Sequence, residues 1–288
     1  MRHVLSQLFH WVTPKRLFFL CMAVAFAKLL HLFIQENAQR LIERADGTVD
    51  LRRKTVEPLV ELTNAYVSNT ATSTVGVVLA SIHTDKLDWL LDYCKETTPF
   101  IYTGERPPEA GLLVPPTLRG RESPAYLSYI VDFYDHLPDY SLFVHAWPEQ
   151  WHNDLFGDLT IDTLRLLRFE SVDARGYVNL RCQHNPGCPA GVWPLTPSEA
   201  DIEKDDIRAH FALAYEQMFN VTREQVPGEL GNICCGQFAV SRERIRERPK
   251  EDYERILEWA ATTDLTDDFG VGWVLEKLWH VIFGMDPV

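Results

Sequence analysis

The chain has 288 residues, of which 46% are hydrophobic and 24% are charged, a composition typical of globular proteins. Its formal net charge is -13. A strongly acidic chain is a poor partner for the nucleic-acid backbone, so we expect no nucleic-acid binding. The sequence contains no GxSxG, P-loop, GxGxxG, HExxH or CxxC motif, which disfavours classical serine hydrolases, NTPases and Rossmann dehydrogenases.

The N-terminal segment is basic and apolar. Residues 1–34 contain four basic residues and no acidic one, whereas the remainder has 24 basic and 41 acidic residues. Residues 17–34 are mostly apolar, close to the about 20 residues that span a membrane. We therefore expect 1–34 to be a cytosolic tail and a single membrane helix, with the body in the lumen of the ER or Golgi. The alternatives are a signal peptide cleaved near "AFA" (25–27) and a buried amphipathic helix of a cytosolic protein.

The next segment, residues 35–74, is mainly charged and polar, and we interpret it as a stem or linker. Residues 75–288 have the length of one large domain, and we expect a single α/β domain there.

The first half of this body alternates between strand-like and helix-like patterns. Apolar, β-branched runs are typical of strands that are buried on both faces, and the runs between them have helical spacing. The segments, in order, are strand 75–81, helix 85–96, strand 99–104, helix 123–137 and strand 140–146. This order predicts a mainly parallel sheet with flanking helices. Ligand sites in such sheets lie beyond the carboxyl ends of the strands.

The second half is less regular. Residues 174–195 are rich in Gly and Pro, which indicates a long ordered loop. A helix is expected over 196–219, with a capping box formed by Thr196 and Glu199. A strand is expected over 233–241, and two further helices over about 242–262 and 271–283.

The stretch "HAWPEQWHND" begins where the third expected strand ends. His145, His152 and Asp154 carry side-chain types that ligate metals, and Trp147 and Trp151 offer apolar walls for a ligand. The structural alternative is a loop that the two tryptophans anchor, in which the histidines only cap strands.

Other candidate residues come with equally simple structural explanations. Glu276 and His280 are four residues apart and share a helix face, so they form either a base with its partner or a routine intrahelical pair. Arg121 precedes an expected helix N-terminus, a place that binds phosphate well. The structural alternative is that the charged residues there only interact with the helix dipole. Gly236 and Gln237 lie within an expected strand, where a glycine lets a ligand approach or marks a bulge.

Two motifs depend on the compartment. Cys182 and Cys188 flank a turn and are expected to form a disulfide in an oxidising lumen, while zinc binding with His184 is the alternative. "NVT" makes Asn220 a glycosylation acceptor if the body is lumenal.

Three long segments, beginning "GRESPAYLSY", "CCGQFAVSRE" and "VLEKLWHVIFG", resemble a fungal family catalogued only as domain of unknown function 3431. The layout is also similar to glycosyltransferases of the A-type nucleotide-diphospho-sugar fold. Those enzymes bind metal and diphosphate through an Asp-x-Asp motif, which is absent from this chain. His145 and Trp147 stand where that motif is expected.

The resemblance implies a membrane-anchored protein that moves a sugar from a nucleotide donor to a small-molecule or glycan acceptor. By this analogy Arg121 would hold the diphosphate and Glu276 would be the base. His145 and His152 would act in catalysis and, with His280, would surround a divalent metal or the phosphate. Two alternatives remain open: a metal-assisted tailoring enzyme of fungal secondary metabolism, and a non-catalytic membrane accessory protein.

Overall fold

The computed structural model describes residues 14–154 and 157–288, so the predicted cytosolic tail at 1–13 lies outside the described residues. The chain divides into two compact units, Met1–Arg53 and Lys54–Val288. The long helix α2 (Pro14–Val67) supplies the described part of the first unit. Within the described ranges, no helix combines the length and the apolar character needed to cross a membrane. Large apolar side chains are nevertheless exposed along the first half of α2, at Met22, Phe26, Leu29, Leu30, Phe33 and Ile34.

The end of α2 belongs to the body rather than to a stem. Val56 and Leu59 are buried in a core cluster with strand residues of the sheet. The Thr63 hydroxyl donates a hydrogen bond to the carbonyl of Pro99, at 2.5 Å. The compact body therefore begins at Lys54, within the segment 35–74 that was predicted as a stem or linker.

A five-stranded sheet forms the centre of the described body, in the order β2-β1-β3-β5-β4. The strands are β1 (Val75–Ser81), β2 (Thr98–Thr103), β3 (Tyr140–Phe143), β4 (Tyr177–Asn179) and β5 (Phe238–Ser241). Strand β1 pairs in parallel with β2 and β3, whereas β5 pairs antiparallel with β3 and β4. The sheet is therefore mixed, and the expectation of a mainly parallel sheet is corrected.

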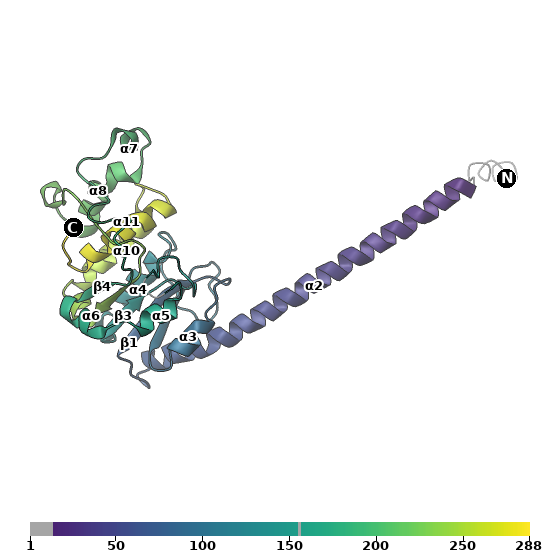
Figure 1. Ribbon diagram of the computed structural model, residues 1–288, viewed down its shortest axis with the longest axis horizontal. Helices are drawn as coiled ribbons and strands as arrows, with labels where there is room; N and C mark the ends of the chain where they lie inside the picture. The colour runs from purple at the N-terminus through teal and green to yellow at the C-terminus, as the bar shows by residue number, and fades with distance from the viewer. Residues whose placement is uncertain (1–13, 155–156) are drawn as a thin grey trace. The chain divides into compact units, whose positions relative to one another are not determined.

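Helices cover both faces of the sheet (Figure 1). One core cluster joins the sheet to α3 (Asp88–Tyr93), α5 (Thr160–Arg165) and α6 (Phe169–Arg175). The larger cluster joins it to α4 (Ser123–Phe133), α8 (Ile207–Phe219), α10 (Lys250–Thr262) and α11 (Asp268–Ile282). Apolar residues of the strands alternate between the two clusters, as Val77 and Val78 do, because successive strand side chains point to opposite faces.

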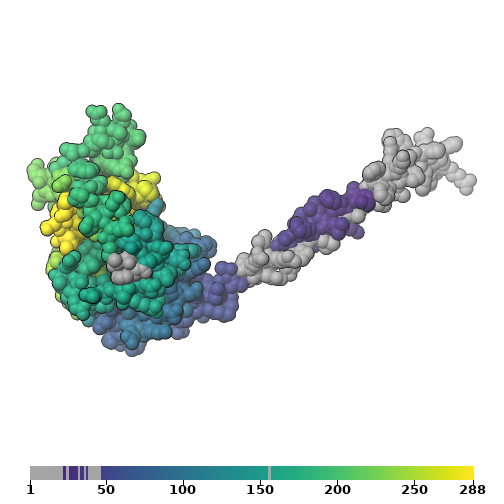
Figure 2. Space-filling view, viewed as in Figure 1, coloured from purple at the N-terminus to yellow at the C-terminus, as the bar shows by residue number. Residues whose placement is uncertain are grey.

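Short helices complete the chain: α7 (Glu199–Glu203), α9 (Arg242–Arg246), and the 3-10 helices η2 (Tyr134–His136) and η3 (Arg223–Gln225). Figure 2 shows the α7–α8 region as a green lobe that projects from the body.

The expected helix at 196–219 is two helices. Its capping box is formed by Ser198 and Asp201, not by Thr196 and Glu199. The chain then turns at Asp205, where φ is 52°, and Asp206 caps α8.

Candidate functional site

The carboxyl ends of β1 and β3 and the start of β5 meet at one edge of the sheet. Because β5 runs antiparallel to β3, Phe143 pairs with Phe238, which brings the residues that follow β3 next to the residues that precede β5. The amide of His145 donates a hydrogen bond to the side-chain oxygen of Gln237, at 3.2 Å. Gln237 in turn donates to Asn153 at 2.9 Å, so the loop after β3 is tied to the start of β5.

A cavity of about 230 Å³ opens at this edge, and we call it the histidine cavity. Its lining comes from the loop before α4, the loop after β3, the segment before β5 and one face of α11. The lining residues are Arg121, Glu122, His145, Trp151, His152, Cys235, Phe269, Gly272, Trp273 and Glu276. The four α11 residues recur at three- and four-residue spacing, which places them on one side of the helix.

The two histidines contact each other in this cavity. Their ring centroids lie 4.9 Å apart at an interplanar angle of 71°. His152 is only 4% exposed, and neither of its ring nitrogens has a hydrogen-bond partner among the described residues. Burial, together with the nearby His145 and Arg181, lowers the pKa of His152 to about 4. His152 is therefore neutral at pH 7 and offers one donor and one acceptor nitrogen to a ligand.

Glu122 faces His145 across a narrow gap. The distance from its Oε1 to the His145 Nε2 is 3.9 Å, which is too long for a direct hydrogen bond. The His145 Nε2 is also buried without a partner in the described part of the chain. Gly236 has a φ of 51°, and a Cβ added there would lie 3.2 Å from Glu122 Oε1 and 3.8 Å from His145 Nε2. A glycine at this position therefore keeps the space beside both side chains open.

Arg181 packs against Trp151, one of the residues that line the cavity. Its guanidinium lies 4.9 Å from the Trp151 ring centre and forms a buried salt bridge with Asp154 at 2.8 Å. Burial alone would raise the pKa of Asp154, but the hydrogen bonds from Arg181 and from the Cys182 amide outweigh it and lower that pKa. The pair therefore stays ionised and holds Trp151 in place.

Arg121 is the cation of the histidine cavity. Its guanidinium lies over the Phe269 ring at 4.8 Å, and it forms no salt bridge with any carboxylate in the described ranges. An exposed guanidinium without a carboxylate partner is suited to bind an anionic ligand. Glu276, by contrast, accepts a hydrogen bond from Lys277 at 2.9 Å.

The structure brings most of the sequence-predicted site residues together. The histidine cavity is lined by Arg121, His145, Trp151, His152 and Glu276. Gln237 holds the loop after β3 through its hydrogen bonds with His145 and Asn153. Trp147 lies outside, with the Lys86 ammonium 5.5 Å from its ring centre. His280 lines a different cavity.

The predicted metal set of His145, His152 and His280 is therefore not assembled. No group of three or more His, Cys, Asp or Glu side chains is arranged to hold a metal within residues 14–154 and 157–288. Glu276 lines both cavities, while His280, one turn further along α11, lines only the other one.

Sequence reasoning missed several residues of the histidine cavity. Glu122 was not singled out as a site residue, although it lies beside Arg121 in the sequence. Phe269 and Trp273 were not singled out, although Trp273 precedes Glu276 by three residues and so shares its helix face. That spacing was a usable signal.

The cysteines differ from the prediction. Cys182 and Cys188 are free, and the disulfide joins the neighbours Cys234 and Cys235. The amide of Cys182 is bound to Asp154, whereas Cys188 lines the second cavity, so the two residues face different surroundings. Cys235 forms part of the wall of the histidine cavity, and Cys234 accepts a hydrogen bond from Arg181 at 2.6 Å.

One family model matches the chain. It is described as "Protein of unknown function (DUF3431)" and covers residues 77–288, a range that includes nearly all of β1, the other four strands and every residue of the histidine cavity. No curated protein and no solved structure matches the chain.

Proposed function

The chain belongs to the DUF3431 family, and we propose that it is a transferase that moves a sugar from a nucleoside diphosphate donor to a hydroxyl acceptor. One observation carries this proposal. The histidine cavity combines a cation without a carboxylate partner, Arg121, with aromatic walls and a carboxylate, Glu276. It lies at the edge of the sheet where α/β proteins bind ligands.

The donor is expected to bind through its diphosphate and its rings. Arg121 and the N-terminus of α4 attract the phosphates, because a helix N-terminus carries free amides and a partial positive charge. Trp151 and Trp273 provide flat apolar faces for the base or the sugar. The neutral His152 donates one hydrogen bond and accepts another inside the cavity.

Glu276 is the proposed base. It takes the proton of the acceptor hydroxyl while that oxygen forms a bond to the anomeric carbon of the sugar. The bond between this carbon and the diphosphate breaks, and the nucleoside diphosphate leaves with the electron pair and is stabilised by Arg121. Since the predicted set of three histidines is not assembled, no step is assigned to a metal.

Nucleotide binding tests the donor half of this proposal. We expect uridine diphosphate or guanosine diphosphate to bind in calorimetry, and Arg121→Ala to weaken that binding by about 10- to 100-fold, the loss of a charge-assisted contact. Arg165→Ala is the matched control, because Arg165 is an exposed arginine on α5 and lines neither cavity. Equal affinities for the two variants would contradict the proposal.

Turnover tests the role of Glu276. Glu276→Gln keeps the size of the side chain but removes the base. We expect it to bind nucleoside diphosphate as the wild type does and to lose about 100-fold or more in transfer or hydrolysis of the bound donor. Full turnover in this variant would remove Glu276 from the mechanism.

The N-terminal segment supports attachment to a membrane with the body in the secretory lumen. Exposed apolar residues line the first half of α2, and residues 1–34 carry four basic residues and no acid, whereas the rest of the chain is net acidic. Asn220 is exposed at the C-terminal end of α8, which leaves it accessible to a glycan. The disulfide between Cys234 and Cys235 is typical of an oxidising compartment.

A further inference from the structure

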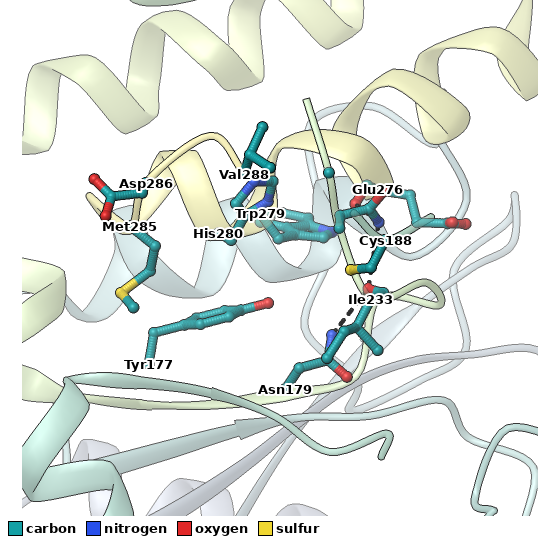
Figure 3. A pocket seen from close by; sticks show the side chains of 13 residues that line it. Tyr177, Asn179, Cys188, Ile233, Glu276, Trp279, His280, Met285, Asp286 and Val288 are labelled. Carbon is teal, nitrogen blue, oxygen red and sulfur yellow. Dashed lines mark hydrogen bonds between the residues drawn. The ribbon is translucent and has the colours of Figure 1, made fainter. Parts of the chain in front are cut away.

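A second cavity of about 180 Å³ lies beside the histidine cavity, and we call it the C-terminal cavity. Figure 3 shows it between α11, which contributes Glu276, Trp279 and His280, and strand β4, which contributes Tyr177 and Asn179. Ile233 closes one side, and Met285 and Val288 close another. Its walls are therefore mainly apolar and aromatic.

The two cavities meet at two residues. Glu276 lines both of them. Gly236 lines the C-terminal cavity, and a Cβ added to it would lie 3.8 Å from His145 Nε2 and 3.9 Å from Trp279 Nε1. A molecule in the C-terminal cavity would thus lie next to a molecule in the histidine cavity, with the Glu276 carboxylate at their junction.

The charges of the C-terminal cavity differ from those of its neighbour. Among the described residues, no Lys or Arg lines it, and the acids that line it are Glu276 and Asp286. Burial lowers the pKa of His280, although the hydrogen bond with the Pro287 carbonyl opposes this, so the ring is neutral at pH 7. The two carboxylates would repel an anion, and no cation in the lining would offset this repulsion. An uncharged molecule is not repelled.

Polar groups in the apolar wall are placed to bind a single oxygen. Trp279 is only 2% exposed, and its buried indole nitrogen has no hydrogen-bond partner in the described part of the chain. An unpaired buried N–H is costly, so an oxygen that accepts its hydrogen bond would gain affinity. The Tyr177 hydroxyl points into the same space (Figure 3).

We propose that the C-terminal cavity holds the acceptor, and that the acceptor is an uncharged, mainly apolar molecule with a hydroxyl group. This inference rests on the proposed transferase function. The acceptor hydroxyl gives its proton to Glu276 and bonds to the anomeric carbon of the donor in the histidine cavity. The nucleoside diphosphate leaves from that same carbon with the bonding electrons.

Binding of a model acceptor tests the class of molecule. We expect 2-naphthol to bind the full chain in calorimetry, and 2-naphthoate, which has a carboxylate in place of the hydroxyl, to bind at least about tenfold more weakly, a difference of about 1.4 kcal/mol. Equal binding of the two compounds would overturn the inference.

A filled cavity tests the location. Ile233→Trp places a larger side chain in the C-terminal cavity and should weaken 2-naphthol binding by about tenfold or more while leaving uridine diphosphate binding within about twofold. Ile202→Trp is the matched control, since Ile202 is 59% exposed on α7. Unchanged 2-naphthol binding in Ile233→Trp would overturn the inference.

The two proposals fail separately. Binding of uridine diphosphate without any binding of 2-naphthol overturns the acceptor cavity and leaves the donor site in place. Binding of 2-naphthol without any binding of uridine or guanosine diphosphate supports the ligand class of the cavity and overturns the transferase function.

Discussion

At the scale of single residues, the rings of His145 and His152 contact each other in the histidine cavity. His145 and His152 were predicted together because they follow a strand at the ligand-binding edge of a sheet, and both line one cavity. Their separation from His280 was not predictable from spacing. Glu276 and His280 share a helix face, but a cavity wall covers only part of that face, and the side-chain packing that decides which part is invisible in the sequence.

The buried His152 should make the stability of the protein depend on pH. Its pKa is about 4 in the folded chain and near 6.5 in an unfolded chain. Because the folded state disfavours the protonated ring, the stability due to neutral His152 is fully present above about pH 6.5 and is lost as the pH falls toward about 4.

Urea unfolding at pH 7.5 and pH 4.5 measures this effect. We expect the free energy of unfolding of the wild type to fall more between these two pH values than that of His152→Gln, whose side chain does not titrate. Parallel pH profiles for the two proteins would show that the protonation of His152 is not coupled to folding.

At the scale of elements, apolar runs predicted β1 and β2 to within one residue, whereas the strands predicted at 140–146 and 233–241 are longer than the observed β3 and β5. The direction of β5 was not predictable, because a buried strand has the same apolar pattern whether its neighbour is parallel or antiparallel. The β4 strand lies in a Gly- and Pro-rich segment that was interpreted as a loop. It has only three residues, which is too short for an alternating pattern to stand out.

The last turns of α2 should contribute to the stability of the body. Leu59 is completely buried against the sheet, so Leu59→Ala is expected to lower the free energy of unfolding by about 2–5 kcal/mol. Leu62 lies on the same helix and is 38% exposed, and Leu62→Ala should cost well under half as much. Urea unfolding of both variants provides the measurement. Equal losses would mean that α2 does not pack on the body as described.

At the scale of the whole molecule, charge is distributed unevenly along the chain. Residues 1–34 have no acid, and the rest of the chain has 41 acidic residues against 24 basic ones. The acidic surface does not prevent an anionic donor from binding, because Arg121 supplies a local cation at the cavity. It does disfavour non-specific binding of the body to anionic surfaces, so the proposed attachment to a membrane would come from the N-terminal segment.

The apolar residues of α2 should therefore decide whether the full chain stays with membranes. Phe26 and Phe33 are 68% and 64% exposed, and transferring large apolar side chains from water to lipid is favourable. We expect the full chain expressed in eukaryotic cells to remain in the membrane pellet after a carbonate wash. Phe26→Glu combined with Phe33→Glu should release most of it, because charged side chains in lipid are costly.

A second double variant controls for the added charge. Val49 and Leu51 are also exposed, at 68% and 61%, but they lie beyond the apolar run, so Val49→Glu combined with Leu51→Glu should leave the protein in the pellet. The orientation follows from glycosylation: an endoglycosidase-sensitive mass shift that Asn220→Gln abolishes places the body in the lumen, where Asn220 meets the glycosylation machinery. Release of the wild type by carbonate, or equal release of the two double variants, would mean that α2 does not attach the protein to membranes through its apolar residues.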